Sequence, residues 1–117
     1  MAGITKRLLS ASTAGRGISV TGTTATGSVI HTSVTGTTSF DEVWLWAVNT
    51  ATAAKKLTVE WARSTGNAGQ AVEFTVPAED GPYLVVPGWP LNTGRSVRAY
   101  AATASVVTCH GYVNRIA

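Results

Sequence analysis

The stretch Val43–Val48, which reads Val-Trp-Leu-Trp-Ala-Val, decides the fold class of this chain. In a β-strand successive side chains point to opposite faces. Val43, Leu45 and Ala47 then cover one face, and the two tryptophans and Val48 cover the other. A strand between a core and water should alternate apolar and polar residues. Because this strand is apolar on both faces, we expect a second cover outside the sandwich, which points to a binding or assembly protein.

Composition favours strands and one domain. The chain has 117 residues, a length typical of a single domain with a real core. Charged residues make up only 13%, against about 25% in an average globular protein. Threonine and serine supply the polar surface instead, and threonine suits a pleated, half-buried surface.

The pattern along the chain predicts short strands separated by turn clusters, and no window shows a helical apolar stripe. The expected strands are 17–22, 28–35, 42–49, 56–63, 71–76, 83–87, 95–102 and 105–116. We expect 42–49 and 56–63 to form one hairpin, and 56–63 and 71–76 to form the next. This spacing is typical of all-β sandwiches.

Residues 1–16 carry the net charge of +3 through Lys6, Arg7 and Arg16, with no acid among them. We expect a basic N-terminal arm over 1–16 and a β-sandwich domain over 17–117. The arm is either a solvated tail or a segment that docks on an acidic surface. Nucleic acid is not expected as a partner, because three cations are few and no aromatic residue lies among them.

Two further features concern apolar contacts. Trp89 lies in Pro87-Gly88-Trp89-Pro90-Leu91, which reads as a rigid turn, so its ring either covers the end of the core or is an exposed contact. The strands carry few charges to protect sheet edges. We therefore expect another subunit to cover an edge or a face.

No residue set identifies a reaction, so we expect no catalytic site, metal or cofactor. Cys109 is the single cysteine, which suits a cytoplasmic origin, and it cannot share a site with His110 because strand neighbours face opposite ways. His31 could pair with either. Asp41-Glu42 and the pair at 79–80 read as surface turns without metal-ligand spacing. No apolar run is long enough for a signal peptide or a membrane span.

Several segments between Val43 and Ile116 resemble small structural proteins encoded among the head and tail genes of tailed bacteriophages. The resemblance covers about three fifths of the chain and contains no catalytic motif. It is carried by Leu45-Trp46-Ala47-Val48-Asn49-Thr50, Leu57-Thr58-Val59-Glu60-Trp61, Thr75-Val76-Pro77-Ala78-Glu79, Val85-Val86-Pro87-Gly88 with Leu91, Arg98-Ala99-Tyr100-Ala101-Ala102 and Gly111-Tyr112-Val113-Asn114-Arg115-Ile116.

The resemblance implies a virion protein, assembled in the host cytoplasm, whose fold is a single-domain antiparallel β-sandwich of jelly-roll type with an extended N-terminal arm. The expected function is capsid decoration as a homo-oligomer, with a trimer favoured and the major capsid protein or another virion protein as partner. The alternative is a carbohydrate-binding module or a fibre- or tail-associated adhesion protein that uses Trp89. The expected interface residues are Lys6, Arg7, Arg16, Trp44, Trp46, Trp89 and Leu91.

Overall fold

The computed structural model describes residues 3–117, and these contain nine strands and no helix. Among them no helix could cross a membrane, in length or in apolar character. The strands are β1 Ile4–Leu8, β2 Ile18–Ser19, β3 Ser28–Thr32, β4 Phe40–Asn49, β5 Lys55–Arg63, β6 Gln70–Val76, β7 Tyr83–Leu91, β8 Ser96–Ala101 and β9 Val107–Ile116. The eight strands predicted from the sequence correspond to β2 through β9.

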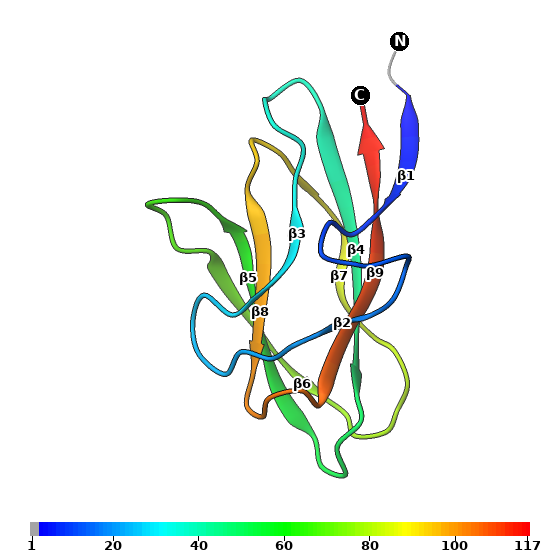
Figure 1. Ribbon diagram of the computed structural model, residues 1–117, viewed down its shortest axis with the longest axis vertical. Coiled ribbons are helices and arrows are strands. Elements are labelled where there is room, and N and C mark those ends of the chain that lie inside the picture. The colour runs from blue at the N-terminus through cyan, green and yellow to red at the C-terminus, as the bar shows by residue number, and fades with distance from the viewer. Residues whose placement is uncertain (1–2) are drawn as a thin grey trace.

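The strands form two antiparallel sheets packed face to face, so the predicted all-β sandwich is confirmed (Figure 1). Sheet A has the order β1-β9-β4-β7, and β2 pairs with β9 on the same edge as β1. Sheet B has the order β3-β8-β5-β6. The pairs β2–β9, β3–β8, β4–β7 and β5–β6 are therefore nested one inside the next along the chain.

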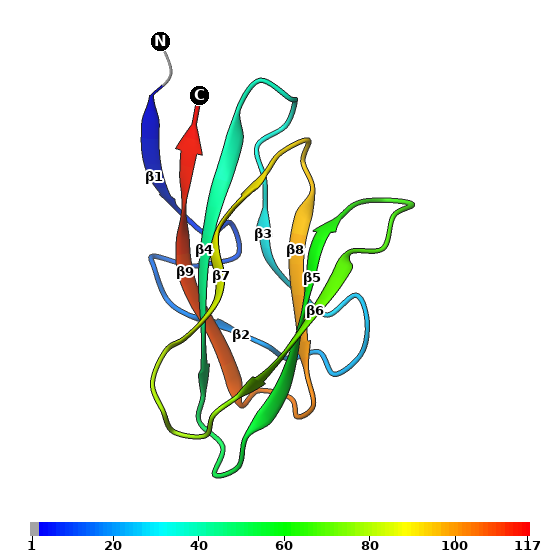
Figure 2. The same cartoon turned by 180° about the vertical axis from the view of Figure 1, so that it is seen from behind.

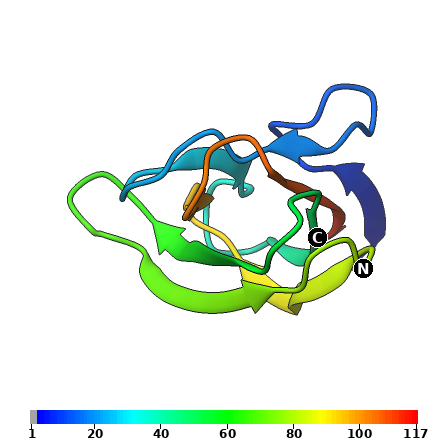
Figure 3. The ribbon, with the colours of Figure 1, turned by 90° about the horizontal axis from the view of Figure 1, so that it is seen from below.

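The core lies between the two sheets, which face each other in the view along the strands (Figure 3). The inward face of β4, with Val43, Leu45 and Ala47, is fully buried. It faces Leu57 and Val59 of β5 together with other aliphatic side chains of sheet B. The prediction that one face of the Val43–Val48 stretch enters the core is confirmed.

The N-terminal segment is part of the sandwich over the residues that the structure describes. Ile4–Leu8 forms β1, which pairs with residues 112–116 of β9, and Leu9 is buried in the core. The prediction of an extended arm over 1–16 therefore does not hold for residues 4–9, because residues 4–8 pair with the edge of β9 and Leu9 enters the core. Residues 1–2 of the predicted arm lie outside the described part of the chain. β1 and the end of β9 lie side by side at one end of the molecule (Figure 2).

Two predictions about local connections are wrong. The strands at 42–49 and 56–63 do not form a hairpin, because β4 belongs to sheet A and β5 to sheet B. The second predicted hairpin, β5 with β6, is confirmed. The turn predicted at 87–91 is instead the second half of β7, where the register shifts beside Gly88 let the strand continue.

Candidate functional site

The outer face of sheet A carries a row of aromatic side chains from two neighbouring strands. The rings of Trp44 and Trp46 stack with centroids 6.2 Å apart, and Trp46 stacks on Tyr112 at 6.1 Å. The Lys6 ammonium lies 4.4 Å from the Tyr112 ring centroid, within cation–π range. We call this surface the aromatic face; strand register places on it Lys6, Leu8, Glu42, Trp44, Trp46, Val48, Leu84, His110, Tyr112 and Asn114.

Two neighbours fix the orientation of Trp44. Its indole N–H donates to Glu42 Oε1 at 2.8 Å, and Asn114 Nδ2 donates to the same oxygen at 3.1 Å. These two hydrogen bonds lower the pKa of the Glu42 carboxyl. Gly88 has φ +78°, and a Cβ there would lie 2.7 Å from the indole ring. The polar atom of Trp44 is thus satisfied within the chain, while the ring remains at the surface.

The aromatic face has no covering layer among residues 3–117, and its tryptophans are only half-buried. Beside Trp46, a shallow hollow of about 360 Å³ is lined by Trp46, Val48, Pro82 and His110. The most exposed large apolar side chains are on the two edge strands of the same sheet: Ile4 (71% exposed) and Leu8 (54%) on β1, Tyr83 (39%) and Leu84 (44%) on β7. Leu8 and Leu84 lie on the aromatic face by strand register, whereas Tyr83 is paired with the inward-facing Ala47 and packs edge-to-face on Phe74 of sheet B.

The structure brings together only some of the predicted interface residues. Lys6, Trp44 and Trp46 share the aromatic face. Arg7 and Arg16 are exposed, in β1 and in the β1–β2 connection.

Trp89 and Leu91 lie elsewhere. Trp89 packs edge-to-face on Trp61 at 5.3 Å and contacts the core, and Leu91 is buried. Leu91 therefore belongs to the core, whereas Trp89 is half-buried at the core margin and does not lie on the aromatic face. The strand register that continues through Gly88 turns them inward.

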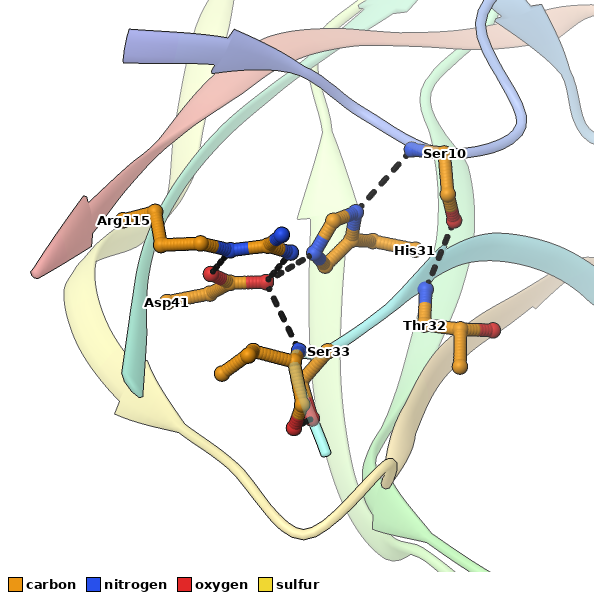
Figure 4. Close-up of polar contacts among 7 residues, drawn as sticks. Ser10, His31, Thr32, Ser33, Asp41 and Arg115 are labelled. Atoms are coloured by element: carbon orange, nitrogen blue, oxygen red, sulfur yellow. Dashed lines mark hydrogen bonds and ion pairs between the residues drawn. The ribbon is translucent and has the colours of Figure 1, made fainter. Parts of the chain in front are cut away.

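A buried polar cluster joins the two sheets at the end of the sandwich where β1 lies (Figure 4). The Asp41 carboxylate accepts a forked pair of hydrogen bonds from Arg115, at 2.7 Å from Nε and 3.0 Å from Nη2. Its Oδ2 also accepts from His31 Nε2 at 2.8 Å and from the Val34 N–H at 3.1 Å. The other ring nitrogen of His31 accepts from the Ser10 N–H at 3.0 Å. The cluster thus connects β3, β4, β9 and the β1–β2 connection.

These contacts determine which groups are charged. His31 Nδ1 accepts a backbone N–H, so its Nε2 carries the proton given to Asp41 and the ring is neutral. Burial lowers the pKa of His31, and the hydrogen bond with Asp41 opposes this only in part. Burial would raise the pKa of Asp41, but the hydrogen bonds from Arg115 and His31 outweigh it and keep the pKa below its usual value. An ion pair between buried Asp41 and partly exposed Arg115 therefore lies beside a neutral histidine.

The Ser10–His31–Asp41 set has the residue types of a nucleophilic triad but a different geometry. Ser10 contacts the histidine through its backbone N–H, and its Oγ accepts from the Thr32 N–H at 2.7 Å. Neither ring nitrogen of His31 is available to take a proton from a hydroxyl. The arrangement holds β3, β4, β9 and the β1–β2 connection together.

This cluster was not predicted from the sequence, because Asp41 was interpreted as part of a surface turn. Asp41 is fully buried. The signal was present in the strand period, since Asp41 precedes Val43 by two residues and so shares its inward face. Had the predicted strand 42–49 been extended by two residues at its N-terminal end, it would have placed the Asp41 carboxylate in the core, where a buried charge needs a partner.

The Cys109 and His110 side chains lie on opposite faces of β9, as predicted. Cys109 is buried, and burial raises the pKa of its thiol to about 12, whereas His110 is exposed on the aromatic face. Within residues 3–117 no group of three or more His, Cys, Asp or Glu side chains is placed to hold a metal ion.

No protein-family model, curated protein or solved structure matches this chain.

Proposed function

We propose that this chain is a non-enzymatic structural protein of a tailed-phage virion, a capsid decoration protein that binds the head as a homo-oligomer. The observation that carries the proposal is the aromatic face, a row of half-buried aromatic rings with no covering layer among the described residues. Large exposed apolar patches mark interaction sites. Tryptophan and tyrosine are also the residues that most often dominate binding energy.

The strand order supports a jelly-roll type for the sandwich. Apart from β1, eight strands form two four-stranded sheets in which β2–β9, β3–β8, β4–β7 and β5–β6 are nested pairs. Eight strands in two sheets built from a folded-over long hairpin are the defining pattern of jelly rolls, a fold found in viral capsid proteins and in lectins. A fold alone does not fix a function, so the surface carries the argument.

The two edges of sheet A support association between copies. Exposed apolar side chains lie on both edge strands, Ile4 and Leu8 on β1 and Tyr83 and Leu84 on β7. A contact between the β1 edge of one copy and the β7 edge of the next is heterologous, and such contacts form a ring where the rotation between copies closes. We propose a trimeric ring of this kind, in which the hollow beside Trp46 receives an apolar side chain of the neighbouring copy.

Two basic side chains of the N-terminal segment bear on contact with the capsid shell. Arg7 and Arg16 are exposed and do not belong to the aromatic face. We propose that they attract an acidic patch of the major capsid protein, which would raise the rate of docking more than its affinity.

The proposal is tested by the mass of the full chain in solution, measured by light scattering. A trimer is expected at micromolar concentration, and replacing Ile4 or Leu84 by lysine should shift the chain toward monomer. A second measurement is cosedimentation with phage heads that lack the protein, where saturable binding is expected. A monomer that does not bind such heads would contradict the proposal.

The residue on which the adhesion alternative depended is not an exposed contact. That alternative relied on an exposed Trp89, whereas that ring is half-buried and packs edge-to-face on Trp61 against the core.

A further inference from the structure

The outer face of sheet B holds a polar groove of about 450 Å³, between the β5–β6 loop and the segment that joins β2 to β3. Its walls come from four separate parts of the chain. Hydroxyl groups and two guanidinium groups dominate the lining, and the described residues that form it include no aromatic ring and no carboxylate: Thr26, Thr32, Arg63, Ser64, Thr65, Gly66, Gly94, Ser96 and Arg98.

Two local backbone distortions lie next to the two arginines of this groove, Arg63 and Arg98. The β5–β8 register shifts between Glu60 and Arg63, and Ala62 has φ +59° within that bulge. The extra residue turns Arg63 to the face of Glu60, and the two side chains pair at 2.9 Å. On the opposite wall Thr26 has φ +72° and its carbonyl accepts from Arg98 Nη1 at 3.3 Å. Bulges and left-handed non-glycine residues concentrate at functional sites.

The polar network beneath the groove is incomplete. Glu60 is 5% exposed, and its Oε1 has no hydrogen-bond partner. Arg98 lies directly opposite Glu60 on β8, and its buried Nε also has no partner. A guanidinium has five N–H donors, and Arg98 uses one of them, in a long bond. Unsatisfied charged groups are costly in free energy, so a ligand that lets Arg98 rearrange and complete the network gains from it.

We propose that this groove binds an oxyanion carried on a hydroxyl-bearing molecule, namely a sugar acid. Arg98 supplies a forked donor for the carboxylate, and the serine and threonine hydroxyls of the walls suit ligand hydroxyl groups. Glu60 pairs with Arg63, so of the two lining arginines it is Arg98 that has no carboxylate partner among the described residues. The site goes beyond the structural role proposed above, since it lies on the other sheet and does not involve the aromatic face.

The test is titration of the isotope-labelled full chain with D-glucuronate, followed by amide chemical shifts. Saturable shifts are expected for the amides of Thr65, Gly66 and Ser96, with a dissociation constant of about 1 mM, typical of a weak small-ligand site. D-glucose, which lacks the carboxylate, and acetate, which lacks the hydroxyls, should each bind at least about tenfold more weakly. Inorganic phosphate at the same concentration reports whether any oxyanion suffices.

Three variants make the result specific. Arg98→Gln should abolish the glucuronate shifts, and Arg98→Lys should weaken binding because lysine lacks the forked donor. Lys56→Gln removes the same charge from the other end of the β5 outer face and should leave binding unchanged; all variants should keep the native amide spectrum elsewhere. The proposal is overturned by an absence of saturable shifts with glucuronate, by equal binding of glucose or phosphate, or by shifts that persist in Arg98→Gln.

Discussion

The outer faces of the two sheets differ in chemistry although both belong to the same small sandwich. On sheet A the outward positions of β4 and β9 carry stacked aromatic rings, with Lys6 above Tyr112. On sheet B the outward positions of β5, β6 and β8 carry ion pairs, Lys56 with Glu73 and Glu60 with Arg63, together with hydroxyl groups. One outer face is thus mainly aromatic, whereas the other is mainly charged and hydroxyl-bearing, with Thr58 and Glu60 buried at its centre.

This difference separates two roles of apolar residues within one strand. The inward side chains of β4 are buried by the chain itself, whereas its outward tryptophans are buried only in part. If folding alone had shaped β4, its outward positions would resemble those of β5, where Lys56 and Glu60 alternate with the core residues. The aromatic face therefore reflects a second requirement, which we attribute to association.

The largest expected effect comes from the inward face of β4. Leu45→Ala should lower the free energy of unfolding by about 2–5 kcal/mol, because it leaves a cavity in a fully buried site. Trp46→Ala, one residue away on the aromatic face, should cost the monomer clearly less. Chemical denaturation of both variants measures the difference, and an equal loss would mean that both faces of β4 serve the core.

Acid should weaken the buried polar cluster around Asp41, which joins the two sheets. The pKa values of His31 and Asp41 are both lowered in the folded state. The folded protein then binds fewer protons than the unfolded chain, so stability falls as the pH drops. The loss begins below the usual histidine pKa of 6.5 and continues below the usual aspartate value of 3.8.

Thermal unfolding between pH 7 and pH 3 measures this dependence. The unfolding temperature should decline steadily below about pH 6.5. His31→Gln should be less stable at neutral pH but should lose the upper part of the decline. A wild-type unfolding temperature that stays constant from pH 7 to pH 5 would contradict the neutral, buried state assigned to His31.

A smaller effect is expected from the glycine beneath Trp44. Gly88→Ala introduces a Cβ 2.7 Å from the indole ring at φ +78°, and Gly81→Ala introduces one at φ +70° in open space. Both variants carry the backbone cost of roughly 1–2 kcal/mol, so their difference isolates the contact with Trp44. Only Gly88→Ala should shift the tryptophan emission spectrum; equal spectra would show that Gly88 does not position Trp44.

The smallest effect is expected on the water-facing side. Lys56 and Glu73 form an exposed ion pair across β5 and β6, and such pairs contribute little to stability. Lys56→Gln should leave both the unfolding midpoint and the association state unchanged. A clear change in association would place an interface on sheet B and remove the distinction between the two faces.

The two-residue periodicity of side chains along strands accounts for most of the fold that was predicted correctly. It located β2 through β9 and the inward face of β4, because alternation is a local property. It could not assign β4 and β5 to different sheets, since pairing partners are chosen by contacts distant in sequence. β1 was missed because Ile4–Leu8 has no apolar face of its own to bury and is ordered by the edge of β9.

The candidate surface was predicted only in part, for the same reason. Trp44 and Trp46 share a face by alternation alone, but Tyr112 and Lys6 join them through strand pairing. The segment around Trp89 was predicted as a turn because it holds two prolines in a short stretch, and both alternatives for its ring, a cover on the core or an exposed contact, were left open. Both prolines lie in the edge strand β7, where a missing N–H is tolerated.

The central claim is that the aromatic face mediates association and the outer face of sheet B does not. Sedimentation equilibrium of the wild type, Trp46→Thr and Tyr100→Thr tests it most directly, because each variant replaces one half-buried outward aromatic ring. We predict an oligomer whose dissociation constant rises at least about 30-fold in Trp46→Thr, as for a residue worth about 2 kcal/mol, and is unchanged in Tyr100→Thr. A monomeric wild type, or equal weakening by both replacements, would contradict the claim.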